Sequence, residues 1–90
     1  MMTVSQNVKI QNLKGLHARA TSVFVKLADS FDADIFVSKK DLTVNGKSIM
    51  GILTLGAPLG ETITISATGI DAEEAVWALV RLVNEKFGEE

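Results

Sequence analysis

Cysteine is absent from this 90-residue sequence, and histidine, tryptophan and proline occur once each. The absence of cysteine excludes a disulfide scaffold, thiolate chemistry and cysteine-based zinc sites. A core without disulfides suits a reducing compartment, so we expect a cytoplasmic protein. No stretch approaches the ~20 consecutive apolar residues of a membrane span, and the N-terminus has no charged head followed by an apolar run. We therefore expect no secretory signal and no membrane insertion.

An excess of one charge is also missing, because the formal net charge is only −2 at pH 7. The basic residues are scattered, which argues against electrostatic binding of nucleic acid. A metal site would need several convergent histidine, cysteine or carboxylate ligands, and no glycine spacing matches a nucleotide-binding loop. We expect no metal and no cofactor, and the expected partners are proteins and small anions.

What the sequence does contain is a clean alternation between two hydrophobic periods. Hydrophobic residues make up 47% of the chain, enough for one small globular core, so residues 1–90 are expected to form a single domain. A period of two predicts strands, and a period of three to four predicts helices. The predicted strands cover 8–11, 34–38, 42–44 and 61–68. The apolar stripes of the predicted helices run over 20–31, 49–53 and 76–87, with the second helix closed by Gly56 and the last one opened by Asp71.

Polar residues mark the starts of two of these helices. Ser48 stands at the N-cap position of the second, and Asp71 with Glu74 resembles a capping box for the last. The element order is then βαββαβα. One-faced strands and short connections predict an α+β fold, a two-layer open-faced sandwich in which three helices cover one face of a four-stranded antiparallel sheet. Periodicity does not give the order of the strands in the sheet.

The one histidine, His17, lies at the predicted start of the first helix, in the segment "GLHARAT". A histidine there can simply cap the helix, so its position alone does not establish a function. Three features favour a functional role. Gly15 allows a close approach to the backbone, and Arg19 can reach an anion bound beside the ring. The first helical amides also lack intrahelical acceptors; they are those of Ala18, Arg19 and Ala20.

Together these features predict a site for a doubly charged tetrahedral anion against the imidazole. The positive end of the helix favours a neutral, nucleophilic ring. Such a ring can attack a phosphoryl donor and form a phosphohistidine held by the amides and the arginine. A Ser-His-Asp hydrolase is disfavoured because no serine lies in a nucleophile elbow. The sequence therefore predicts a phosphoryl acceptor that does not generate its own phosphoryl group.

Two segments resemble the signatures of a known family. "GLHARAT", residues 15–21, is similar to the active-site segment of HPr, the histidine-containing phosphocarrier of the bacterial phosphoenolpyruvate-dependent phosphotransferase system. "KSIMGILTLGA", residues 47–57, is similar to the segment that holds the family's regulatory serine. The resemblance covers nearly the whole chain, including the element order. Both motifs occur in order and at the family's separation, which makes the match specific.

The resemblance implies a role for each motif residue. His17 would accept a phosphoryl group at its δ nitrogen from enzyme I and pass it to enzyme IIA domains, with Arg19 assisting. The protein would serve sugar uptake and carbon regulation as a transfer intermediate rather than a free-standing enzyme. Ser48 would be the target of HPr kinase/phosphorylase. An exposed apolar docking surface would surround His17 and comprise Leu16, Ile49, Met50 and Leu53.

One residue departs from the family pattern: Ala20 stands where proline usually follows the arginine. Proline fixes φ and lacks an N–H, so alanine restores one donor at the anion site. Two other interpretations remain open at this point, a nitrogen-related (NPr-like) carrier with a mainly regulatory role and a docking module without chemistry. A carrier that exposes its active face to successive partners is most simply a monomer, and we expect one.

Overall fold

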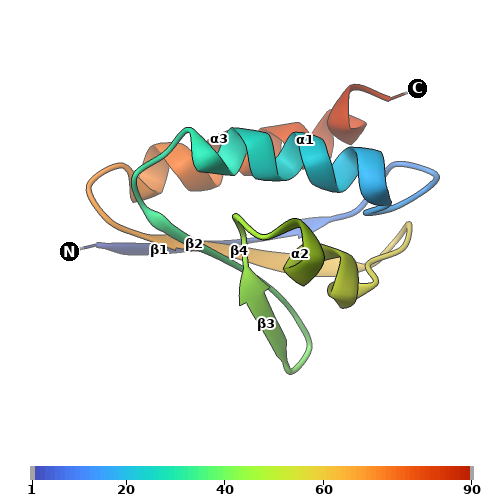
Figure 1. Ribbon diagram of the computed structural model, residues 1–90, viewed down its shortest axis with the longest axis horizontal. Helices are drawn as coiled ribbons and strands as arrows, with labels where there is room; N and C mark the ends of the chain where they lie inside the picture. The colour runs from blue at the N-terminus through green and yellow to red at the C-terminus, as the bar shows by residue number, and fades with distance from the viewer. Residues whose placement is uncertain (1, 90) are drawn as a thin grey trace.

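The computed structural model describes residues 2–89, which form an antiparallel sheet with helices on one face (Figure 1). The fold class and the βαββαβα order are those predicted. The elements are β1 (Thr3–Lys9), α1 (Ala18–Asp29), β2 (Asp34–Lys39), β3 (Leu42–Asn45), α2 (Ile49–Leu55), β4 (Thr62–Thr68) and α3 (Ala72–Asn84), followed by a 3₁₀ turn (Lys86–Gly88).

The four strands are ordered β1-β4-β2-β3, and every neighbouring pair is antiparallel. Side chains alternate between the two faces of a sheet, and the register of the strands places their apolar residues on the same face. In β4, Ile63 pairs with Val8 of β1, and Ile65 pairs with Val37 of β2. These four side chains are buried, so one continuous apolar face lies under the helices.

One hydrophobic cluster joins this face to the helices. Phe24 of α1 and Leu79 of α3 are completely buried, as is Ile52 of α2. Figure 1 shows α1 and α3 side by side above the sheet, whereas α2 lies at the end near β3. The start of α1 and the C-terminal segment lie at the same end of the molecule in this view. That proximity shapes the functional site.

The predicted capping box at the start of α3 is wrong. Asp71 is the N-cap residue, but its side chain makes no capping hydrogen bond. Its carboxylate instead accepts from the backbone N–H groups of Asp32 and Ala33, each at 2.8 Å. These bonds, the one from Asp32 foremost, lower the pKa of the Asp71 carboxyl. Asp71 thus ties the loop between α1 and β2 to the start of α3.

The last helix is also shorter than its apolar stripe predicted. Helix α3 ends at Asn84, and Phe87 lies beyond it with a positive φ of 58°. Lys86 and Gly88, on either side, have φ values of 59° and 77°. Phe87 is nevertheless buried, so its apolar contact is kept while the chain turns away from the helix axis. A spacing rule cannot detect such a turn, because it counts residues and does not see backbone direction.

Candidate functional site

His17 is the N-cap residue of α1. Its backbone is extended (φ −77°, ψ 179°), and its side chain makes no capping hydrogen bond. The first backbone bond into the helix runs from the Thr21 N–H to the His17 carbonyl at 2.9 Å. The three preceding helical amides therefore have no intrahelical acceptor and are available to an anion; they belong to Ala18, Arg19 and Ala20.

The loop before His17 is held by a close backbone contact. Gly15 adopts a φ of +65°, which side-chain-bearing residues rarely adopt. A Cβ at this position would lie 2.6 Å from the Ala57 carbonyl oxygen and 2.9 Å from Cα of Pro58. The same Ala57 carbonyl accepts from the Leu16 N–H at 2.9 Å. The absence of a side chain at Gly15 therefore allows the loop to dock closely, two residues before His17.

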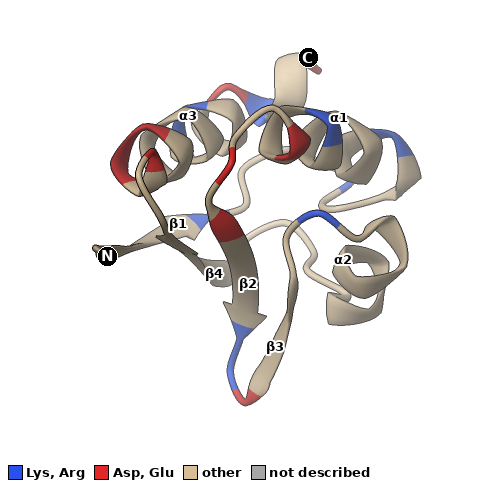
Figure 2. Ribbon diagram, turned by 60° about the vertical axis from the view of Figure 1, so that its left-hand side comes forward, with Lys and Arg blue, Asp and Glu red and all other residues tan. Residues whose placement is uncertain are grey.

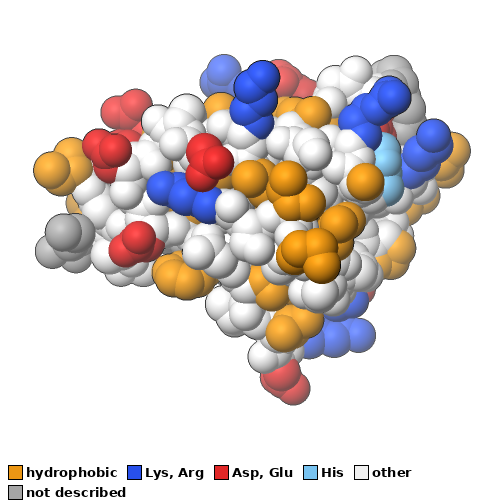
Figure 3. Space-filling model, viewed as in Figure 1, with side chains coloured by type: hydrophobic (Ala, Val, Ile, Leu, Met, Phe, Trp, Pro, Cys, Tyr) orange, Lys and Arg blue, Asp and Glu red, His pale blue; other side chains and the backbone are white. Residues whose placement is uncertain are grey.

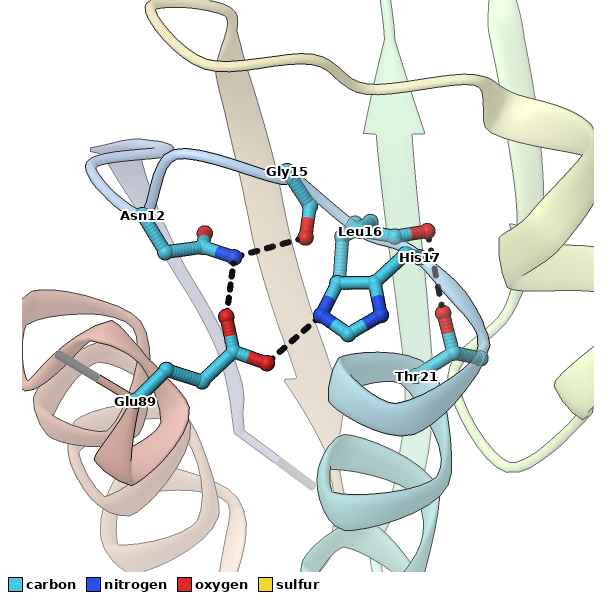
Figure 4. A network of polar contacts seen from close by, with 6 residues as sticks. All are labelled: Asn12, Gly15, Leu16, His17, Thr21 and Glu89. Carbon is cyan, nitrogen blue, oxygen red and sulfur yellow. Dashed lines mark hydrogen bonds and ion pairs between the residues drawn. The ribbon is translucent and has the colours of Figure 1, made fainter.

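A polar chain connects His17 to the C-terminal segment (Figure 4). The Nε2 atom of His17 lies 2.5 Å from Oε2 of Glu89. The other carboxylate oxygen of Glu89 accepts from Nδ2 of Asn12 at 3.0 Å, and the same Nδ2 donates to the Gly15 carbonyl at 2.7 Å. The second ring nitrogen, Nδ1, is turned away from Glu89 toward the first turn of α1 in Figure 4. No hydrogen bond joins Nδ1 to any residue in the part of the chain that the structure describes.

The pKa of the Glu89 carboxyl is lowered by this environment. The hydrogen bond from Asn12 is the largest cause, and the contact with His17 acts in the same direction. The positive charge of Lys14 adds a smaller effect, whereas burial of the carboxyl opposes all three. Glu89 is therefore held as a carboxylate against the imidazole.

A surface hollow of about 630 Å³ lies beside the ring, and two cationic side chains are part of its lining. Its lining includes Lys14, His17, Arg19 and Glu89. Figure 2 places Lys and Arg around the start of α1, whereas acidic residues gather at the start of α3. Arg19 is exposed and makes no hydrogen bond or ion pair with residues 2–89. Its guanidinium is free to turn toward an anion at His17.

The predicted docking surface is only partly exposed. Leu16 is 7% exposed and belongs to the hydrophobic core, so the prediction that its side chain is exposed is wrong. Its N–H donates to the Ala57 carbonyl, and its side chain packs in the core. Ile49, Met50 and Leu53 are exposed, Met50 by 72%. Figure 3 shows the histidine beside Lys and Arg side chains, with hydrophobic side chains close by on the same face.

The structural part of the Ser48 prediction is confirmed. Ser48 is the N-cap of α2, and its Oγ accepts from the Gly51 N–H at 3.0 Å. The helix ends at Gly56, which has a left-handed backbone. Ser48 is partly exposed, and Ile49 and Met50 follow it at the surface. A group attached to Ser48 would therefore stand at the edge of the exposed apolar surface.

Across residues 2–89, no three His, Asp or Glu side chains converge as a metal site would require. None of the helices in this range combines the length and apolar character needed to cross a membrane.

Sequence reasoning missed two members of the site, Asn12 and Glu89. They lie 77 residues apart, and their contact depends on the turn at Phe87. Asn12 is completely buried, which is unusual for an amide side chain and signals a structural or functional hydrogen bond. Its Nδ2 donates to both the Gly15 carbonyl and Glu89, whereas its Oδ1 has no hydrogen-bond partner within the described chain. Only the three-dimensional structure reveals this connection.

Solved structures share this fold over most or all of the chain. The crystal structure of HPr-C-His from Thermoanaerobacter tengcongensis has a TM-score of 0.91 and 48% sequence identity, and the match covers 100% of this chain and 99% of that one. An HPr dimer from the same organism has a TM-score of 0.78 and 49% identity, with 91% and 94% of the chains covered. Dimers thus occur among these relatives, and the expected monomeric state of this chain is not confirmed.

Sequence comparisons lead to the same family. The family model described as "PTS HPr component phosphorylation site" matches residues 4–85. The phosphocarrier protein HPr of Neisseria meningitidis serogroup A is 44% identical over 86 residues, covering 96% of this chain and 97% of the relative. The phosphocarrier protein NPr of Shewanella violacea is 38% identical over 89 residues, covering 99% and 98%, so the NPr-like alternative is not better supported. The chain belongs to the HPr family and is a phosphocarrier of the phosphotransferase system.

Proposed function

We propose that His17 is the phosphorylated residue, that it receives its phosphoryl group from enzyme I, and that it passes the group to enzyme IIA domains. The observation that carries this proposal is the position of Nδ1. It has no partner in residues 2–89 and faces the turn whose amides lack intrahelical acceptors. The direct test is incubation with enzyme I and phosphoenolpyruvate, followed as an acid-labile, base-stable mass increase of ~80 Da.

The arrangement supports transfer mainly through positioning and charge. The Nδ1 lone pair attacks phosphorus, and the bond between phosphorus and the donor breaks with its electron pair remaining on the donor. The phosphoryl oxygens then lie before the amides of Ala18, Arg19 and Ala20, at the positive end of α1. Ala20 supplies a donor that the family's usual proline lacks. Few further groups are needed, because phosphoryl transfer depends largely on orientation and electrostatics.

Arg19→Ala is expected to slow transfer from phosphorylated enzyme I about tenfold, because one charge-assisted contact to the phosphoryl oxygens is lost. Rapid-quench measurement of phosphoryl transfer gives the rate. Lys26→Ala removes an exposed cation from the last turn of the same helix and serves as the matched control. Equal rates for the two variants would remove Arg19 from the proposed site.

The exposed side chains of Ile49, Met50 and Leu53 are proposed to form the docking surface for enzyme I and enzyme IIA domains. Met50 projects furthest into solvent, and methionine adapts to different partner shapes, which suits a protein that must dock on a donor and on acceptors. The buried Leu16 is not part of this surface. We also propose that the carrier works as a cytoplasmic monomer, since a dimer built on this face would cover the docking residues.

Ser48 is proposed as a regulatory site for HPr kinase/phosphorylase. It is partly exposed at the start of α2, and a dianion there would suit the helix end but lie beside the docking surface. Kinase and ATP should add one acid-stable phosphate to Ser48 and lower the rate of His17 phosphorylation by enzyme I. Ser48→Ala is the control, with an expected loss of about 1 kcal/mol from the missing cap. An unmodified Ser48 after kinase treatment would remove the regulatory role.

A further inference from the structure

We propose that Glu89 is a positioning residue for phosphoryl transfer: its carboxylate holds the Nε2–H form of His17, so that the Nδ1 lone pair faces the phosphoryl donor. This inference rests on the proposed function of His17 and deepens it. The contact joins the penultimate residue of the chain to the start of α1, and neither signature segment contains Glu89.

The hydrogen-bond geometry assigns the proton. A carboxylate can only accept hydrogen bonds, so the Nε2 atom, 2.5 Å from Oε2 of Glu89, must carry the hydrogen in this contact. In a neutral imidazole the other nitrogen is then unprotonated. That nitrogen is Nδ1, which lies on the side of the helix start (Figure 4). The carboxylate therefore selects the tautomer whose free lone pair lies beside the anion-binding amides.

The carboxylate is itself held in place. Asn12 is buried, and its Nδ2 donates to both Glu89 and the Gly15 carbonyl, so it connects the carboxylate to the loop that carries His17. Phe87 is buried two residues before Glu89 and anchors the C-terminal turn. The side chains of His17 and Glu89 are 28% and 18% exposed, so the contact is only partly shielded from water. These restraints keep the imidazole plane oriented before a donor arrives.

The charge of Glu89 also matches the reaction. When the Nδ1 lone pair forms the bond to phosphorus, the Nε2 proton stays on the ring, and the bond between phosphorus and the donor breaks toward the donor. The imidazole thus gains positive charge during transfer. A carboxylate against Nε2 stabilises that charge, because it attracts a positively charged ring more strongly than a neutral one. Glu89 acts through the ring and does not contact the phosphoryl group.

The test compares Glu89→Ala and Glu89→Gln with Glu85→Ala, which removes an exposed acidic residue four positions earlier. One readout is the rate constant for transfer from saturating phosphorylated enzyme I. The second is the His17 tautomer, read from long-range ¹H–¹⁵N NMR spectra at a pH where the ring is neutral. We expect Glu89→Ala to slow transfer about tenfold with an unchanged KM, and to lose the strongly hydrogen-bonded Nε2–H signal. Glu89→Gln should keep the Nε2–H form but transfer slowly, and Glu85→Ala should match the wild type.

Wild-type transfer by Glu89→Ala would overturn this inference while leaving the phosphorylation of His17 intact. A slow Glu89→Ala variant with an unchanged tautomer signal, or with only KM altered, would also overturn it, because Glu89 would then act in docking or folding. Failure of the proposed function is a separate result, since it would appear as wild-type phosphorylation of a His17→Ala protein.

Discussion

His17→Ala should abolish the phosphoryl addition that enzyme I and phosphoenolpyruvate produce. The substitution removes the only imidazole in the chain, and no other side chain offers a neutral nitrogen nucleophile at the start of α1. His17→Gln should fail in the same way, although glutamine is polar and of similar size. The measurement is the intact mass, where the wild type gains ~80 Da and both variants gain nothing.

Ser22→Ala, an exposed change one turn into α1, is the control for this experiment and should behave as the wild type. We expect the His17 variants to stay folded, because the histidine makes no capping hydrogen bond that the helix would lose. The dispersion of their NMR spectra checks this expectation. A His17→Ala protein that still gains an acid-labile phosphate would contradict the assignment of His17.

Gly15→Ala should produce a large loss of stability. The left-handed backbone at φ +65° costs a non-glycine residue ~1–2 kcal/mol. The added Cβ also meets the backbone of Ala57 and Pro58, which cannot move aside as a flexible side chain can. We expect a total loss of about 3 kcal/mol in the free energy of unfolding, measured by urea denaturation.

Gly56→Ala is the matched control. Gly56 has a similar φ of +59°, but nothing lies within 4 Å of the Cβ position. Gly56→Ala should therefore lose only the backbone-conformation part of the free energy of unfolding, about 1 kcal/mol. Because the loop before His17 must shift in Gly15→Ala, that variant should also transfer phosphate more slowly, whereas Gly56→Ala should not. Equal stability losses at the two glycines would show that the close approach to Ala57 does not hold the loop.

The fold was largely predictable from the sequence because its signals are local. Alternation in β4 placed Ile63 and Ile65 inward, and Ser48 caps α2 as its type and position indicated. Two errors arose where tertiary contacts override local pattern. Asp71 bonds the α1–β2 loop in place of its own helix, and Phe87 reaches the core from a turn beyond α3.

Part of the candidate site could be predicted for the same reason. His17, Arg19 and the free amides are neighbours in sequence, so a short motif places them together. Glu89 is 72 residues from His17, and no periodicity relates the two. Leu16 shows a second kind of error: an apolar residue next to the histidine was expected to be exposed, yet it is buried where the loop docks on Ala57. Contacts between distant segments were beyond a sequence pattern.

The measurement that tests the central claim most directly is NMR of the ¹⁵N-labelled protein phosphorylated through enzyme I. Phosphorus should couple to Nδ1 of His17, while Nε2 keeps its proton, and the amide resonances of Arg19 and Ala20 should shift as they meet the phosphoryl oxygens. Phosphorus found on Nε2, or phosphorylation that leaves the amides at the start of α1 unchanged, would contradict the account.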